Sequence, residues 1–452
     1  MNKQNTTKAT TLRLARQLSV LGAMGLATTA YAAKPYDASQ YATGDWGGLR
    51  HELYDKGYDF MFEYVGEAAT NLNGGYNDDR TARYSDQFAL GVQLDLEKIF
   101  GWHGAEFKLA ITERSGRNIS NDRIGDPRAG TLSSSQEVWG RGQTWRLTQM
   151  WVKQTFLDDK LDVKFGRFGE GEDFNSFPCD FQNLAFCGSQ VGNWIGDIWY
   201  NWPVSQWALR VKYNITPEFY AQIGAYEQNP SYLETGNAWK LSGSGTKGAI
   251  IPVEVVWSPS VNGLPGEYRL GYYYSTAKAN DVSEGEDGQL QASSGGAYAT
   301  HSSKHGWWIV AQQQLTAHNG DASRGLSVFA NATVHDKATT VVDSYQQVGL
   351  VYKGLFDGRP KDDIGVGIAR IHVNDDVSDN ARLANAISGI QDYDNPGFVP
   401  VRGSEYDAEI YYGFHVTNWL TVRPNLQYIK RPGGVDEVDN ALVAGLKVQS
   451  KF

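Results

Sequence analysis

The feature that most constrains this chain is an alternation of apolar and polar side chains, which recurs from about residue 58 to the end. Leu90, Val92 and Leu94, for example, would share one face of an extended strand, and Gln87 and Gln93 would share the other. A period of two indicates strands with one apolar and one wet face. A soluble sandwich would need a second core to cover so many apolar faces, whereas a membrane covers them with lipid.

Counting such stretches predicts the architecture. About seventeen candidate strands occur, but single-chain bacterial barrels have an even number, so we expect sixteen, with one candidate miscalled or split. The candidates start near residues 58, 86, 105, 143, 161, 194, 206, 217, 251, 266, 305, 325, 344, 363, 404, 419 and 439. The expected fold is therefore all-β, a transmembrane antiparallel β-barrel over residues 58–452.

The connections between these strands divide into two kinds. Short turns at 157–160 and 415–419 are typical of the periplasmic end of a barrel, and long polar stretches are typical of the outer end. The long stretches are 115–142, 169–193, 278–303 and 375–403. Aromatic residues at strand ends would form the interfacial girdles. They are Trp102, Trp207, Tyr213, Phe219, Trp257, Tyr268, Tyr352, Trp419 and Tyr428.

The first 32 residues predict export. Four basic residues up to Arg16 precede an uncharged stretch, 18–27, and a small-x-small pattern ends at Ala32. This is typical of a cleaved signal peptide, because the apolar run is far shorter than the ~20 residues that a spanning helix needs. Residues 33–57 would then form a short periplasmic segment.

The net charge of the chain limits its possible partners, and its two cysteines predict a disulfide. The first 32 residues hold four of the 41 basic groups and none of the 51 acidic groups, so the remaining chain has a formal charge of −14. Such an acidic chain without a basic block is not expected to bind nucleic acid. Cys179 and Cys187 are predicted to form a disulfide in an oxidising compartment. The small ring would stabilise one loop by about 2–3 kcal/mol.

Several short strings suggest a family. They are Asp45 to Arg50, Lys56 with Gly57, the segment 177–188 around the two cysteines, Thr112 to Arg114, Trp139 to Gly142, and Gly166 to Phe168. Together they resemble the carbohydrate-selective porin family, OprB, of Gram-negative outer membranes. The resemblance implies a sixteen-stranded barrel with inward-folded loops and passive selectivity for glucose and related sugars.

A sugar has vicinal hydroxyls and C–H faces, so a selective pore needs planar charged or amide groups beside aromatic rings. Many charged residues fall on predicted lumen faces. They are Glu63, Glu67, Asp95, Glu106, Lys108, Arg114, Arg210, Lys212, Arg269, Asp407, Glu409 and Arg423. In any barrel, most such lumen charges are only solvated and pair with one another across water.

The residues expected at the constriction lie in or beside two long loops that could face each other. They are Arg114, Glu137, Trp139, Arg141, Arg167, Glu170, Asp173 and Trp194. The alternative is that these loops form only an outer lid.

Two other classes of function would need other features. An outer-membrane or secreted carbohydrate hydrolase would use paired carboxylates, and Glu170 with Glu172 or Asp407 with Glu409 would provide them. An energy-coupled receptor would need 22 strands and a plug, for which residues 33–57 are too few. We expect no metal or cofactor, since no ligand motif occurs.

The expected partners follow from the barrel. They are permeating sugars, outer-membrane lipid and the barrel-assembly machinery, which would read the terminal Phe452. Both a monomer and a trimer are compatible with the sequence.

Overall fold

The computed structural model describes residues 35–196 and 198–452, so the expected signal peptide lies outside the described residues. Sixteen long strands form the barrel wall. They are β1 Tyr58–Gly75, β2 Ala82–Asp95, β3 Ala105–Gly116, β4 Trp145–Phe156, β5 Leu161–Phe168, β6 Gln206–Thr216, β7 Phe219–Gln228, β8 Gly248–Trp257, β10 Leu264–Ser275, β13 Lys304–Gln314, β14 Gly325–His335, β15 Val342–Lys353, β16 Asp363–Val373, β17 Ser404–His415, β18 Leu420–Lys430 and β19 Asp439–Lys451.

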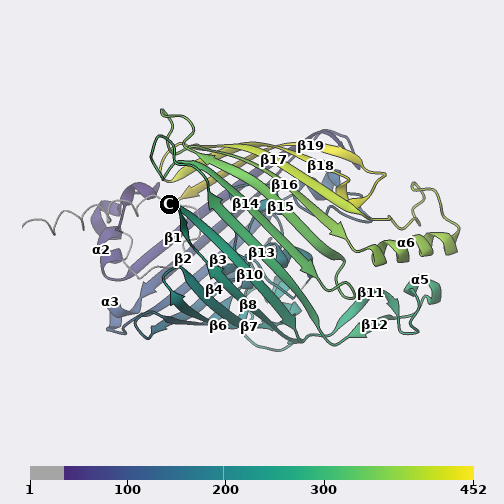
Figure 1. Cartoon of the computed structure of the whole chain (residues 1–452), viewed down its shortest axis with the longest axis horizontal. Coiled ribbons are helices and arrows are strands. Elements are labelled where there is room, and N and C mark those ends of the chain that lie inside the picture. Colours follow the sequence, from purple (N-terminus) through teal and green to yellow (C-terminus); the bar gives the residue numbers. More distant parts are fainter. Residues whose placement is uncertain (1–34, 197) are drawn as a thin grey trace, which may run out of the picture.

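The sheet closes on itself, which confirms the predicted sixteen-stranded antiparallel barrel. Each wall strand pairs with the wall strand before it, and β19 returns to β1, with Glu63 opposite Lys451 and Thr70 opposite Ala444. Closure leaves no unpaired sheet edge among the described wall strands, which a hydrocarbon environment requires. Figure 1 shows the tilted strands running across the molecule.

One of the seventeen candidate strands was wrong. Residues near 194 form the short helix α4, Val191–Trp194, within the connection between β5 and β6. The aromatic residues that follow, such as Trp199, are buried in a cluster of that connection, not on a barrel wall. The apolar residues of this segment pack inside a folded loop, but in the sequence their spacing is similar to that of a strand.

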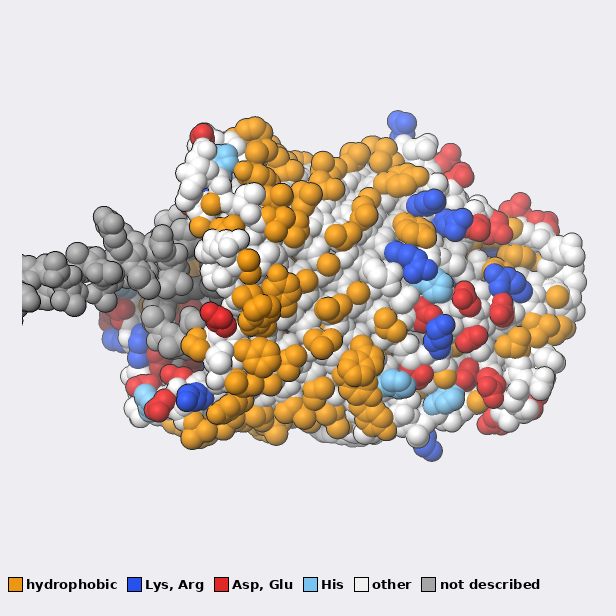
Figure 2. All heavy atoms as spheres, in the orientation of Figure 1, with side chains coloured by type: hydrophobic (Ala, Val, Ile, Leu, Met, Phe, Trp, Pro, Cys, Tyr) orange, Lys and Arg blue, Asp and Glu red, His pale blue; other side chains and the backbone are white. Residues whose placement is uncertain are grey.

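The outer wall is apolar, as the alternation predicts. Phe165, Ile309 and Ile368 are each more than half exposed, which is the pattern of side chains that face lipid. Figure 2 shows a broad band of apolar side chains across the face of the barrel in view. Among the described residues, no helix is long and apolar enough to cross a membrane.

The two ends of the barrel differ (Figure 1). One end carries the C-terminus, short turns such as 157–160, and the helices α2 Leu49–Asp55 and α3 Leu96–Phe100. The other end carries the long connections. These contain the hairpin of β11 Ala279–Gly285 and β12 Tyr298–His301 and the helices α5 Gln291–Ser294 and α6 Asp375–Ser388. The two-residue strand β9, Ser260–Val261, only extends a turn beside β10.

The connection 169–205 folds into the barrel and supplies its apolar core. Phe174, Val191 and Trp199 pack against the inward-facing Tyr273 and Trp308 of β10 and β13. A second cluster joins other aromatic residues of this connection to β14–β17, and its members include Phe181, Phe186, Trp194, Phe329, Tyr345 and Tyr411. Cys179 and Cys187 are bonded to each other, as predicted, with Cα atoms 4.2 Å apart.

Candidate functional site

Two long connections meet inside the barrel. We call them loop 117–144, between β3 and β4, and loop 169–205, between β5 and β6. The backbone N–H of Glu137 donates to the carbonyl of Gln182 at 3.0 Å, and Leu184 N–H donates to the carbonyl of Ser134 at 2.8 Å. The two loops that the sequence singled out therefore form one hydrogen-bonded unit.

Carboxylates of the barrel wall hold this unit in place. Glu405 on β17 accepts the backbone N–H groups of Leu132 and Ser133 at 2.9 and 2.7 Å. On the same strand, Glu409 accepts those of Gln182 and Asn183 at 2.9 and 2.7 Å. Charge-assisted bonds of this kind are strong where water is excluded. These lumen charges thus serve to position the loops.

Two of the predicted site residues come together beside β3. Arg114 faces the lumen, and its Nε donates to Oε1 of Gln87 on β2 at 2.8 Å. Gly142 packs against the backbone of Arg114 so closely that a Cβ added to Gly142 would lie 2.1 Å from the Arg114 carbonyl oxygen. Gln143 N–H donates to that same oxygen at 2.6 Å. The backbone of loop 117–144 is therefore packed against the end of β3, and the carbonyl of the exposed Arg141 accepts from Nε of Arg146 at 2.5 Å.

A buried lysine orients Glu137, a third predicted residue, which lies in the same loop as Arg141. Lys447 of β19 is fully buried, and its Nζ lies 3.0 Å from Glu137 Oε1 and 3.4 Å from Glu67 Oε1. The same ammonium donates to the carbonyls of Cys179 and Phe181 at 3.1 and 2.9 Å. One cation therefore links the barrel wall, loop 117–144 and the disulfide segment of loop 169–205.

Other predicted site residues lie inside the packed part of loop 169–205. Glu170 is fully buried, and its Oε2 accepts the N–H of Tyr200 at 2.8 Å. Burial raises the pKa of the Glu170 carboxyl to about 8. Asp173 lies 2.6 Å from the Nζ of Lys164. Trp194 is buried, with its ring 5.3 Å from that of Tyr345.

Arg167 does not join this group. It stands opposite Trp207 in the register of β5 and β6 and lies on the other face of β5 from Lys164. Its guanidinium lies over the ring of Tyr232 at 4.2 Å and donates to the carbonyls of Lys240 and Ser205. Tyr232 and Lys240 belong to the connection 229–247, which therefore covers this arginine.

The lumen wall toward the short turns is lined with paired charges. Lys153 Nζ lies 3.1 Å from Glu106 Oε2, and Arg210 lies 2.8 Å from Asp162 Oδ1. Lys212 contacts the same aspartate at 3.7 Å. This wall presents both signs of charge to a solute that has passed the loops.

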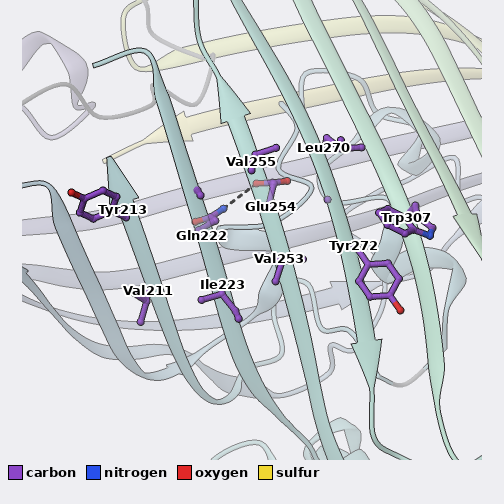
Figure 3. A pocket seen from close by; sticks show the side chains of 12 residues that line it. Val211, Tyr213, Gln222, Ile223, Val253, Glu254, Val255, Leu270, Tyr272 and Trp307 are labelled. Atoms are coloured by element: carbon purple, nitrogen blue, oxygen red, sulfur yellow. Dashed lines mark hydrogen bonds between the residues drawn. The ribbon is translucent and has the colours of Figure 1, made fainter. Parts of the chain in front are cut away.

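A depression on the barrel lies on the other side of the wall (Figure 3). Its lining includes the outward-facing Val211, Ile223 and Val253 of β6, β7 and β8. Gln222 and Glu254 point the opposite way and are hydrogen-bonded to each other at 2.9 Å. This depression therefore faces lipid and is separate from the solute path.

Sequence reasoning missed Lys447. The alternation of β19 places it on the lumen face, opposite Arg423 of β18. A signal was thus present, but the alternation cannot show that two loops and two carboxylates converge on this position.

A closed antiparallel barrel with a lipid-facing apolar wall, a charged lumen and inward loops is an outer-membrane porin. The model of the OprB family of carbohydrate-selective porins matches residues 79–452. The chain therefore belongs to this family, and it is a sugar-selective porin of the bacterial outer membrane.

Individual relatives agree with this assignment. Porin B of Pseudomonas aeruginosa is 71% identical over 438 residues, which cover 96% of each chain. The putative porin QuiX of Acinetobacter baylyi is 46% identical over 421 residues, which cover 91% of this chain and 93% of the relative. The high-pH structure of Pseudomonas putida OprB matches with a TM-score of 0.91 and 79% identity, over 92% of this chain and 99% of that one. These names are those of channels rather than enzymes.

Proposed function

We propose that glucose and related monosaccharides pass between Arg114, Arg141 and Glu137, and that these three side chains select them. The observation that carries the proposal is the close approach of Gly142 to the Arg114 backbone, which brings the segment with Arg141 to the end of β3. Glu137 of the same loop is oriented by Lys447. We therefore propose that charged groups of both signs line the same part of the solute path.

The chemistry of the three groups suits a sugar. A guanidinium presents several N–H donors in a rigid plane, which can bond to adjacent hydroxyls, and a carboxylate accepts from a hydroxyl. The protein bonds replace bonds to water, so the net gain is small and the sugar leaves quickly. Fast passive diffusion with selectivity needs such weak binding.

The other predicted site residues are assigned different roles. Trp139 is partly exposed in loop 117–144, and we propose that its ring stacks on the C–H face of the sugar. Glu170, Asp173 and Trp194 are proposed to act on selectivity only by holding loop 169–205. Arg167 is proposed to anchor the connection 229–247 rather than to contact solute.

Glucose block of ion current in planar bilayers tests the site. Arg114→Gln and Arg141→Gln should each weaken glucose binding by about 1–2 kcal/mol, the usual cost of losing one hydrogen bond to a charged donor. The matched control is Arg80→Gln, which removes the same charge from an exposed position between β1 and β2. Equal block in all three variants and the wild type would show that sugar is selected elsewhere.

We further propose that the chain transports sugars without cleaving them. Asp407 and Glu409 are both buried, and Asn183 hydrogen-bonds to both of them, so these carboxylates do not flank an open cleft. Liposomes containing the protein should swell in glucose faster than in larger oligosaccharides. Chromatography of the external oligosaccharide should then show it intact.

The proposed assembly signal is the terminal phenylalanine. In the folded barrel, Arg50 donates to the carbonyls of Phe452 and Phe60 at 2.8 and 2.9 Å, which ties the end of the chain to β1. We propose that the assembly machinery reads Phe452 before this contact forms. Deletion of Phe452 should lower the amount of protein in the outer membrane.

One barrel contains the whole candidate site, so each chain is proposed to be a working pore, whether alone or in a trimer.

A further inference from the structure

A row of polar side chains crosses the outer face of four adjacent strands, β15 to β18, near the ends that carry the long loops. Gln346 stands opposite Arg370, Arg370 stands opposite Tyr406, and Tyr406 stands opposite Lys430. Residues directly opposite in neighbouring strands point to the same side of the sheet. Their chain neighbours Asp407 and Ile429 are buried on the lumen side, so this row faces outward. We call these four residues the outer polar row.

The outer polar row marks an abrupt boundary. The next row toward the short turns consists of Val348, Ile368, Ala408 and Tyr428, again opposite one another. Val348 and Ile368 are 51% and 57% exposed, as expected for side chains in lipid. Figure 2 shows basic side chains gathered just beyond the apolar band, toward the end with the long loops. The apolar row therefore faces hydrocarbon, and the outer polar row directly beside it carries positive charge.

The two cations of this row are not engaged by carboxylates of the described chain. The guanidinium of Arg370 donates to Gln346 Oε1 at 3.2 Å, and Lys430 Nζ lies 5.8 Å from the ring centre of Tyr406. Among the described residues, neither Arg370 nor Lys430 belongs to an ion pair. Acidic groups do occur nearer the loops, but Asp343 there is paired with His372 at 2.7 Å and with Lys337 at 3.7 Å.

We infer that the outer polar row binds the phosphorylated headgroup of lipid A, the anchor of lipopolysaccharide in the outer leaflet. The long loops place this end of the barrel at the outer leaflet. A guanidinium binds phosphate in a bidentate manner and an ammonium binds it as a point charge, so Arg370 and Lys430 complement its charge. The acyl chains then lie along the apolar row below, where Ala408 leaves room between Ile368 and Tyr428.

The position explains why two cations face lipid at all. A charged side chain on the lipid face of a barrel is costly near the midplane and tolerated only near the interface. A basic residue beside anionic headgroups is instead attracted to them. The site is independent of the solute path, because its side chains point away from the lumen.

Native mass spectrometry of the purified protein in detergent tests the assignment. The probes are lipid A with its phosphates, the same lipid A after removal of its phosphates, and phosphatidylglycerol. The wild type should retain phosphorylated lipid A best. The variant Arg370→Gln with Lys430→Gln should bind it about thirtyfold more weakly, as expected for two surface charges.

The control variant removes two exposed cations that lie elsewhere, Lys160 in the turn after β4 and Lys247 before β8, also by substitution with Gln. It should bind lipid A like the wild type, and both variants should conduct glucose normally in liposomes, which shows that they are folded. Equal retention of lipid A with and without phosphates by the wild type would overturn the proposal. So would equal retention of phosphatidylglycerol, since the row would then be only a general basic girdle.

Discussion

At the scale of single residues, Lys447 shows how the lumen tolerates buried charge. Its ammonium contacts two carboxylates and two carbonyls, and its side chain is fully shielded from solvent. A buried charge persists only when it is paired and hydrogen-bonded, because its desolvation is expensive. Removal of this cation would leave Glu67 and Glu137 close together without compensation.

We expect Lys447→Met to destabilise the barrel by about 3–5 kcal/mol, the usual cost of breaking a buried ion pair. The measurement is the temperature at which the purified protein loses its compact form on gels after heating in detergent. The triple variant that also carries Glu67→Gln and Glu137→Gln removes the uncompensated charges and should regain much of the loss. An unchanged transition in Lys447→Met would contradict the role given to this lysine.

Gly142 is the second residue with a specific role. We expect Gly142→Ala to displace loop 117–144 from Arg114, because the new Cβ would lie 2.1 Å from a backbone oxygen that cannot move aside. Glucose block of ion current should weaken by about tenfold, comparable to losing one arginine contact. Gly236→Ala is the control, since nothing lies within 4 Å of the added atom there. Full glucose block in Gly142→Ala would refute the proposed geometry.

At the scale of elements, loop 169–205 acts as a folded insert in the lumen. It contributes aromatic residues to two clusters and donates hydrogen bonds to wall carboxylates such as Glu254, which accepts the N–H of Asn175 at 2.9 Å. The disulfide constrains a short ring within it. The loop is therefore held by packing, by hydrogen bonds to the wall and by a disulfide.

Glu170 makes the stability of this loop sensitive to pH. Its folded pKa is about 8, above the ordinary value of 4.5, so the folded state binds more protons than the unfolded state between these values. The stability that the protonated Glu170 carboxyl contributes to the folded loop is therefore fully present below pH 4.5. This stability is lost progressively as the pH rises from 4.5 through about 8.

We expect Glu170→Gln to unfold like the wild type at pH 5 and to be more stable than the wild type at pH 9, by on the order of a few kcal/mol. The heating assay at the two pH values measures the difference. Glu234→Gln, on the connection 229–247, is a control for the charge change. A constant difference between Glu170→Gln and the wild type across this range would show that the carboxyl titrates normally.

At the scale of the whole molecule, the barrel depends on an apolar solvent. Its strands expose large apolar side chains such as Ile309 and Ile368, and apolar side chains form a broad band on the face shown in Figure 2. We expect the chain to fold only with detergent or lipid, and circular dichroism with and without detergent measures this. A monodisperse, folded and soluble protein in detergent-free buffer is the result that would contradict it.

The local pattern of the sequence determined the barrel. A period of two in side-chain character is a property of each strand by itself, so it predicted the sixteen wall strands with one false candidate, the lipid-facing wall and the lumen faces of Arg114 and Glu409. Turn length separated the two ends, and the spacing of Cys179 and Cys187 in an exported chain predicted their bond. These signals are local, and each could be interpreted without knowing the partner of any residue.

Only the tertiary structure decided which of the inward residues meet. Arg167 and Glu170 are three positions apart in the sequence, yet one lies under the connection 229–247 and the other is buried in the lumen. Lys447 lies 310 positions from its partner Glu137. Such contacts depend on how the loops fold back and on how sixteen strands stagger on closure, and neither is encoded in the alternation of any one strand.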